Sequence, residues 1–189
     1  MNHFYENITG WTDEGLFSVY SMAVVATPDN GHVVEIGSWK GRSAAYMAVE
    51  IINSGKNIKF DCVDPWTGTS DEEHGFDEDY RKKTLFEAFT KNMEPVAGHY
   101  NAIKLPSVEA SKLYEDESLD FVFIDGDHSY EAVQADIKAW LPKVKPGGCL
   151  AGHDWPWEPL RRAVCDIFPP EDILLSSDKR NTCWLYLKN

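Results

Sequence analysis

The sequence lacks the features of a membrane or nucleic-acid-binding protein. No run of about 18 apolar residues occurs among its 189 positions, so a transmembrane helix is not expected. Residues 1–6 are not a basic segment followed by an apolar one, which argues against a signal peptide. Basic residues are scarce, with 18 Lys and Arg against 31 Asp and Glu and a formal net charge of −13. The first two absences lead us to expect a cytoplasmic protein without membrane partners. Because nucleic-acid binding needs a basic surface, we also expect no nucleic-acid partner.

Cysteine is also rare. The four cysteines, Cys62, Cys149, Cys165 and Cys183, are far apart and form no CxxC pair. We therefore expect reduced thiols in the core rather than a cysteine-based metal site. Hydrophobic residues make up 43% of the chain, so it can bury a substantial core without disulfides or structural metals.

What the chain does contain is a regular alternation of extended and helical patterns. Apolar segments predict strands at 32–36, 59–63, 101–105, 119–124, 149–152, 173–175 and 182–187. Apolar residues at helical spacing predict helices over about 12–27, 43–54, 80–93, 107–114, 130–141 and 159–168. Ser129 is a plausible N-cap, and Pro146–Gly147–Gly148 is expected to break the chain before the fifth strand.

This order predicts an α/β fold. Strands joined through helices need crossover connections, which give a mainly parallel sheet covered on both faces. The last two strands are separated only by a turn, so they should pair antiparallel. We expect one domain over 1–189, with an N-terminal helical segment at 1–30. The acidic loop at 65–79 is interpreted as a lid, although such loops are usually just solvated surface.

In parallel sheets, ligands bind beyond the carboxyl ends of the strands. The first strand runs into VEIGSWKGRS at 34–43, where Gly37 permits a sharp turn and Gly41 lets the next helix begin near a ligand. That helix N-terminus favours a carboxylate, and Glu35 could accept hydrogen bonds from an ammonium group. An amino-acid moiety would satisfy both. The spacing is not GxGxxG, which disfavours a dinucleotide, and the glycines alone could serve only the turn.

The second strand ends at Asp64, directly before Pro65. A carboxylate at this place, 20 residues or more beyond the glycine loop, can bind both hydroxyls of a ribose. The alternative is that Asp64 merely opens a turn.

Two further strand ends carry acids and imidazoles. The fourth strand runs into Asp125-Gly126-Asp127-His128, and the fifth into His153-Asp154. Asp125, His153 and Asp154 could converge on a hard divalent cation, and this ligand set suits magnesium, manganese or iron better than structural zinc. Alternatively, Asp127 and Ser129 serve only as turn and cap residues.

These motifs resemble a known family. Residues 33–44, with the form E-x-G-x-x-x-G-x-S, resemble the first cofactor motif of class I S-adenosylmethionine methyltransferases, including catechol O-methyltransferase. FVFIDGDHSY at 121–130 and KPGG at 145–148 resemble methyltransferase family 24, with macrocin O-methyltransferase and the cephalosporin hydroxylase proteins. The resemblance covers about residues 33–155.

The resemblance implies a Rossmann-like, seven-stranded sheet of order 3-2-1-4-5-7-6 with strand 7 antiparallel. It places Glu35 and Gly37 at the methionine part, Asp64 at the ribose, and Ser107 and Val108 around the adenine. Trp66 would cover the ribose or adenine, or else pack in the core. Asp125 matches the first metal ligand of metal-dependent relatives, and His153-Asp154 takes the place of their acidic or amide pair, although histidine departs from that pattern. The cofactor residues expected are Glu35, Gly37, Ser38, Gly41, Ser43, Asp64, Trp66, Ser107, Val108 and Asp125.

We therefore predict methyl transfer from S-adenosylmethionine to an oxygen of a small hydroxylated acceptor, with Mg²⁺ or Mn²⁺ as an optional second cofactor. Asp125, His128 and His153 are the catalytic candidates, either histidine acting as the base. His128 stands where the catechol enzyme has a lysine base. Two alternatives stay open: a hydroxylase-like enzyme using Asp125 and His153 with iron, and a noncatalytic cofactor-binding module. The sequence also leaves open whether two copies of the chain form a homodimer.

Overall fold

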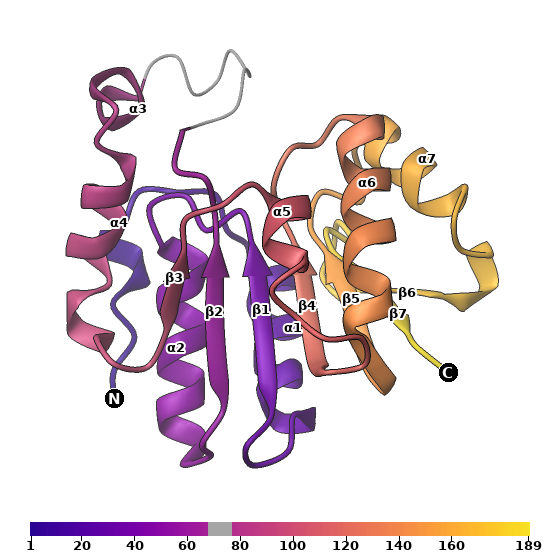
Figure 1. Cartoon of the computed structure of the whole chain (residues 1–189), viewed down its shortest axis with the longest axis horizontal. Helices are drawn as coiled ribbons and strands as arrows, with labels where there is room; N and C mark the ends of the chain where they lie inside the picture. The colour runs from indigo at the N-terminus through magenta and orange to yellow at the C-terminus, as the bar shows by residue number, and fades with distance from the viewer. Residues whose placement is uncertain (68–76) are drawn as a thin grey trace.

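A twisted seven-stranded sheet forms the centre of the computed structural model, which describes residues 1–67 and 77–189 (Figure 1). Its order is β3-β2-β1-β4-β5-β7-β6, as the sequence predicts. Strands β1 to β5 pair in parallel, while β7 is antiparallel to both β5 and β6. The strands are β1 His32–Ile36, β2 Lys59–Val63, β3 Asn101–Ile103, β4 Leu119–Ile124, β5 Val144–Gly152, β6 Ile173–Leu175 and β7 Trp184–Leu187.

Helices cover both faces of the sheet. Because alternate strand residues point to opposite faces, Val33 and Phe121 pack against α1, α2 and α4, whereas Val34 and Val122 pack against α5, α6 and α7. None of the helices in the described residues is long and apolar enough to cross a membrane. The helices are α1 Glu14–Ala26, α2 Arg42–Ser54, α3 Glu78–Lys82, α4 Leu85–Asn92, α5 Ser107–Ser111, α6 Tyr130–Trp140 and α7 Glu158–Cys165, with short 3-10 turns at Tyr5–Asn7, Glu94–Val96, Leu141–Lys143 and Pro170–Asp172.

The expected elements differ from the observed ones most clearly at two places. The helix predicted over 80–93 is broken into α3 and α4, because Lys83 adopts a left-handed backbone with φ of 59°. Strand β5 begins at Val144 and passes through Pro146–Gly147–Gly148, which the sequence reasoning placed before the strand. A register shift between Leu119 and Phe121 of β4 accommodates these residues as an irregularity in the ladder.

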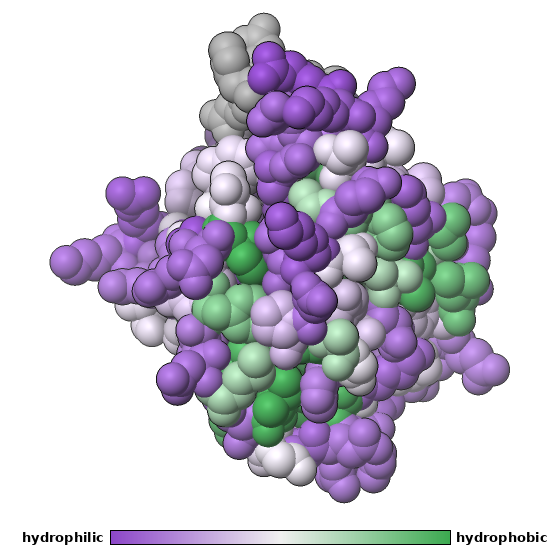
Figure 2. Space-filling view, turned by 90° about the vertical axis from the view of Figure 1, so that its left-hand side faces the viewer, coloured by the Kyte–Doolittle hydropathy of each residue, from purple (hydrophilic) through white to green (hydrophobic). Residues whose placement is uncertain are grey.

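The acidic segment at 65–79 is covered only at its ends, because residues 68–76 lie outside the described residues. The expected lid is therefore untested. On the side of the molecule where α3 and α4 lie, hydrophilic residues dominate the surface and apolar residues form smaller areas (Figure 2). This distribution agrees with the excess of acidic side chains in the sequence.

All four cysteines are free thiols, as expected. Cys62 and Cys183 are fully buried, and burial raises the pKa of the Cys62 thiol well above its ordinary value. Cys149 and Cys165 are only partly buried, so the expectation of four core thiols holds for two of them.

The buried carboxylate of Asp61 links strands β1, β2 and β3 through side-chain contacts. Asp61, on β2, accepts hydrogen bonds from Asn101 Nδ2 at 2.7 Å and Tyr114 OH at 2.9 Å, and His32 Nε2 lies 2.7 Å from its second oxygen. Burial alone would raise the pKa of Asp61, but the hydrogen bond with His32 and the other two donors lower it to about 2. The ionised carboxylate is thus strongly favoured in the folded state.

Asp61→Asn is expected to lower the free energy of unfolding at pH 7 by about 2–4 kcal/mol, because it leaves buried donors without a charged acceptor. The wild type should also lose stability as the pH falls from about 4 to about 2, where a depressed folded-state pKa stops contributing. Asp61→Asn should not show the loss of stability that comes from protonation of the Asp61 carboxylate. Urea denaturation followed by tryptophan fluorescence at several pH values measures both effects, with the exposed Asp116→Asn as the control. Parallel pH profiles for wild type and Asp61→Asn would contradict this role.

Candidate functional site

The turn after β1 joins the ends of three strands. Gly37 N–H donates to Val63 O of β2 at 2.9 Å, and Asp125 N–H donates to Ile36 O at 2.8 Å. Gly37 has a φ of 91°, and a Cβ built on it would lie 1.9 Å from the carbonyl oxygen of Asp125. No other residue fits there, so Gly37 sets how closely the carboxyl ends of β1 and β4 approach.

The buried carboxyl group of Glu35 is hydrogen-bonded to Ser38 of this turn. It is 1% exposed, and its two oxygens accept hydrogen bonds from Tyr20 OH at 2.7 Å and Ser38 Oγ at 2.8 Å. Burial raises the pKa of Glu35 to about 7, although hydrogen bonds from Ser43, Tyr20 and Ser38 act in the opposite direction. Glu35, Ser38 and Ser43, expected at the cofactor, are therefore engaged with one another and with Tyr20.

Gly41 also faces the interior. A Cβ there would lie 3.0 Å from Met93 Cγ and 3.1 Å from Phe89 Cδ2, both in the core. Its φ of 88° at the N-cap of α2 explains the glycine without a ligand.

A cavity of about 440 Å³ opens at the carboxyl ends of β1 and β2. Four of the residues expected at the cofactor line it: Gly37, Asp64, Ser107 and Val108. The remaining lining residues are Ile36, Trp39, Val63, Pro65, Pro106, Gly126, Asp127, Ala132, Ala135 and Asp136. The lining is mainly apolar, with carboxylates at separate places, which is the composition of a site for a flat ligand with polar edges.

Asp64 organises the mouth of this cavity. Its carboxylate accepts hydrogen bonds from the backbone N–H of Trp39 at 2.9 Å and of Trp66 at 2.6 Å. Both tryptophans have a left-handed backbone, with φ of 45° and 50°. Such strained positions are held by their surroundings and are frequent at ligand sites. A carboxylate has about four acceptor positions, so the side chain of Asp64 is of a type that can bind a ligand hydroxyl beside backbone donors.

Of the two tryptophans, Trp39 and not Trp66 lines the cavity. Trp66 is 4% exposed and packs against Phe86 and Phe89, with ring centroids 4.8 and 4.7 Å apart. The alternative of core packing for Trp66 is therefore correct. Trp39 was missed, because only the folded turn shows which side chain faces the cavity.

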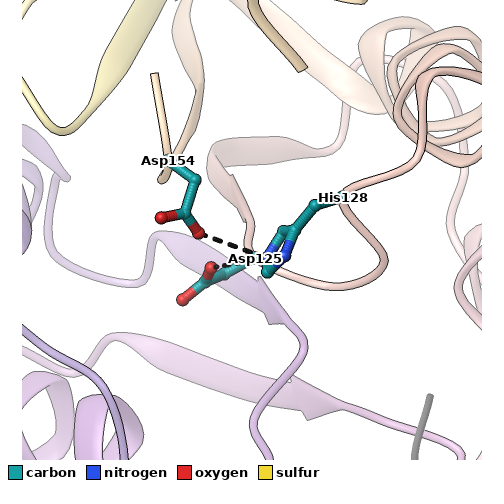
Figure 3. A group of neighbouring side chains, drawn as sticks. All are labelled: Asp125, His128 and Asp154. Atoms are coloured by element: carbon teal, nitrogen blue, oxygen red, sulfur yellow. Dashed lines mark ion pairs between the residues drawn. The ribbon is translucent and has the colours of Figure 1, made fainter. Parts of the chain in front are cut away.

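Beside the cavity, Asp125, His128 and Asp154 form a polar cluster (Figure 3). His128 Nε2 lies 3.2 Å from Asp154 Oδ2 and 3.8 Å from Asp125 Oδ1. One ligand atom from each residue lies within 4.8 Å of the other two, a spacing that can hold a metal ion. The sequence reasoning chose His153 as the imidazole of this set, whereas the structure brings His128 into it.

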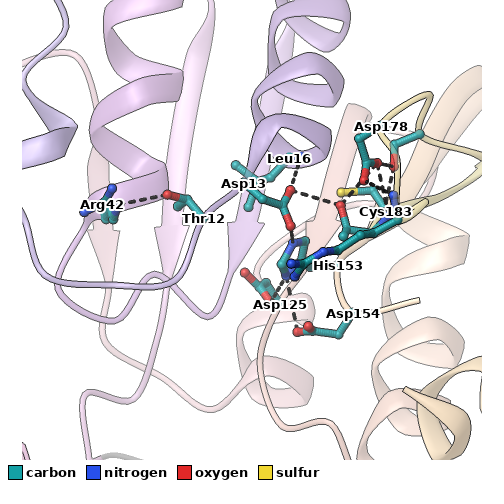
Figure 4. Close-up of polar contacts among 12 residues, drawn as sticks. Thr12, Asp13, Leu16, Arg42, Asp125, His153, Asp154, Asp178 and Cys183 are labelled. Carbon is teal, nitrogen blue, oxygen red and sulfur yellow. Dashed lines mark hydrogen bonds and ion pairs between the residues drawn. The ribbon is translucent and has the colours of Figure 1, made fainter. Parts of the chain in front are cut away.

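His153 lies next to this cluster, and one of its ring nitrogens faces Asp13 (Figure 4). Its Nδ1 is 3.3 Å from Asp154 Oδ2 and 3.8 Å from Asp125 Oδ1, while its Nε2 is 3.0 Å from Asp13 Oδ2. Burial alone would lower the pKa of His153, but the charge of Asp125 and hydrogen bonds with Asp13 and Asp154 raise it to about 11. Each ring nitrogen of His153 therefore faces a carboxylate, Asp13 on one side and Asp154 on the other.

Asp13 was not identified from the sequence as a site residue. It caps α1 by accepting a hydrogen bond from Leu16 N–H at 3.0 Å, and it also accepts one from Thr182 Oγ1 at 3.0 Å. Burial alone would raise the pKa of Asp13, but the hydrogen bonds with His153, Leu16 N–H and Thr182, together with the charge of His153, lower it to about 2. Aspartate before a helix is so common as an N-cap that the residue gave no signal of a second role.

The sheet order, with β7 antiparallel and helices on both faces, defines a Rossmann-like fold. Residues 34–155 match the family Methyltransf_24, described as a methyltransferase domain. The chain therefore belongs to this family of class I S-adenosylmethionine-dependent methyltransferase domains.

A curated relative and two solved structures are similar to this chain. The uncharacterized protein y4gI of Sinorhizobium fredii is 26% identical over 80% of this chain, which spans only 16% of that protein. The O-methyltransferase NovP is 18% identical with a TM-score of 0.68, covering 93% of this chain and 80% of NovP. CalS11, a TDP-rhamnose 3'-O-methyltransferase of calicheamicin biosynthesis, is 15% identical with a TM-score of 0.58, covering 90% of this chain and 76% of CalS11. At these identities the two structures show a shared fold.

Proposed function

We propose that this domain transfers the methyl group of S-adenosylmethionine to an oxygen of a small hydroxylated molecule. The observation that carries the proposal is the cavity of about 440 Å³, which is lined together by Gly37, Asp64, Ser107 and Val108. These residues come from different turns, and the family resemblance assigns them to different parts of one cofactor. The oxygen acceptor is favoured by the similar folds of the O-methyltransferases NovP and CalS11, and a sugar hydroxyl by the action of CalS11 on TDP-rhamnose.

The residues present fit this cofactor. Asp64 would accept hydrogen bonds from the ribose, Ser107 and Val108 would lie at the adenine, and the backbone at Gly37 would lie along the methionine part. The carboxylates of Asp64 and Asp127 on the cavity also favour a cationic ligand. When bound, the sulfonium makes its methyl carbon electrophilic. The protein then has to orient the acceptor oxygen, exclude water and remove one proton.

The cluster of Asp125, His128 and Asp154 fits a hard divalent cation. Two carboxylate oxygens and an imidazole that lie within 4.8 Å of one another are suited to Mg²⁺ or Mn²⁺ with open positions for further ligands. Such an ion would lower the pKa of an acceptor hydroxyl. Without an ion, His128 would take the acceptor proton, because its imidazole is part of the cluster and lies 3.2 Å from Asp154 Oδ2. His153, held by Asp13, would stabilise the neighbouring carboxylates in either case.

Asp64→Ala is expected to weaken binding of S-adenosylhomocysteine by about 1–3 kcal/mol, the usual effect of losing a buried polar partner. Asp64→Asn should weaken it less, because one amide oxygen still accepts a hydrogen bond. Isothermal titration calorimetry measures both, with Asp116→Ala as a control on the surface. NAD should show no comparable affinity. Tight NAD binding by the wild type, or an unchanged affinity in both Asp64 variants, would contradict the proposed site.

A further inference from the structure

One face of α6 forms a wall of the cavity. Ala132, Ala135 and Asp136 all line it, and their spacing of three and four residues places them on the same side of the helix. The two alanines leave room close to the helix backbone. The apolar residues Ile36, Val63 and Val108 line the same cavity, so it offers apolar surface to a flat ring.

Asp136 is the polar member of this wall. It is 5% exposed, and its Oδ2 lies 3.9 Å from the position that a Cβ on Gly126 would take. The carboxylate is therefore directed past Gly126, at the end of β4, and not out to solvent. A carboxylate buried this far normally needs several hydrogen-bond donors.

Ser107 is the donor that the described residues supply to Asp136. Trp140 Nε1 donates to Ser107 Oγ at 2.9 Å, which leaves the hydroxyl hydrogen of Ser107 for Asp136. Burial raises the pKa of Asp136 to about 6, the hydrogen bond from Ser107 lowers it, and the charge of Asp127 raises it further. An ionised carboxylate has acceptor capacity beyond one hydroxyl, so a ligand that brings a donor to this wall would be stabilised.

We propose that Asp136 accepts a hydrogen bond from the exocyclic amine of adenine and makes the cofactor site selective for adenine over hypoxanthine. This inference rests on the proposed function. Adenine is the flat, apolar-faced part of S-adenosylmethionine, and its exocyclic amine is a donor. Hypoxanthine carries a carbonyl oxygen at the same place, which would face the carboxylate without a hydrogen between them.

The test compares S-adenosylhomocysteine with S-inosylhomocysteine, its deaminated analogue, by calorimetry. Wild type should bind the adenine compound at least about 30-fold more tightly, the effect of an unpaired buried carboxylate. Asp136→Asn should reduce this ratio to below about threefold, because an amide can donate to the carbonyl or accept from the amine. Glu131→Gln, the matched control at an exposed carboxylate of the same helix, should keep the wild-type ratio.

Three results would overturn the assignment. If Asp136→Asn is folded by circular dichroism and keeps the wild-type ratio, Asp136 does not contact the base. If the variant binds both ligands more weakly by the same factor, Asp136 only supports Ser107 and α5. If wild type does not bind S-adenosylhomocysteine at all, the proposed function fails and this assignment fails with it.

Discussion

Gly37→Ala is expected to abolish folding of the domain, or to lower its free energy of unfolding by more than about 3 kcal/mol. A Cβ at this position would lie 1.9 Å from the carbonyl oxygen of Asp125 and 2.4 Å from its carbonyl carbon. These are backbone atoms of a central strand end, so they cannot move aside as a flexible side chain could. Relief would require β1 and β4 to separate at the edge where the cavity lies.

Gly98→Ala is the matched control for this variant. Gly98 has a φ of 88°, close to the 91° of Gly37, but a Cβ there would meet nothing within 4 Å. It should lose only about 1–2 kcal/mol, the effect of a left-handed backbone on a residue with a side chain. Urea denaturation of both variants separates the two causes. Similar losses in both would show that the close approach of β1 and β4 is unimportant.

Asp125→Ala is expected to reduce methyl transfer by at least about 10³-fold while changing the affinity for S-adenosylhomocysteine less than about twofold. Asp125 Oδ1 lies 3.8 Å from both His128 Nε2 and His153 Nδ1, so its carboxylate contacts both imidazoles of the polar cluster. The cavity is lined instead by the neighbouring Gly126 and Asp127. Removing the side chain should therefore affect the acceptor and its proton more than the cofactor.

The assay uses methyl-labelled S-adenosylmethionine with a panel of phenols and nucleotide sugars, and Asp116→Ala as the control. A chelator should reproduce the loss in wild type, and Mg²⁺ or Mn²⁺ should restore the rate. If chelation leaves the rate intact, the cluster acts as an acid–base site and His128→Ala should remove the neutral limb of the pH profile. Full activity of Asp125→Ala would contradict any role of the cluster in transfer.

The sheet could be predicted from the sequence because its signals are local. The apolar segments at 32–36, 59–63 and 119–124 match β1, β2 and β4 residue for residue. The absence of a helix between the last two strands predicts their antiparallel pairing correctly, while the complete strand order came from the family resemblance. The apolar pattern gave the wrong helix boundaries around Lys83. The left-handed backbone of this residue interrupts the helix, and no helical pattern in the sequence reveals it.

The lining of the cavity could be predicted in part, for a related reason. Asp64, Ser107 and Val108 stand in motifs whose position in the strand order places them at the cavity. Glu35 stands in an equally clear motif, yet its burial beneath the turn depends on Tyr20 of α1, a partner distant in sequence. The surroundings of Asp13 and Asp136 likewise depend on packing between elements that are distant in sequence. Sequence spacing shows which residues share a sheet edge, but packing decides which of them line the cavity.

The most direct test of the central claim is a crystal structure of the protein soaked with S-adenosylhomocysteine. The ligand should occupy the cavity at the carboxyl ends of β1 and β2, with its ribose at Asp64 and its adenine between Val108 and α6. The homocysteine part should lie along the turn at Gly37 and point toward Asp125. Ligand density at another surface, such as the separate hollow lined by Ile52, Lys56 and Tyr100, would contradict the assignment of the site.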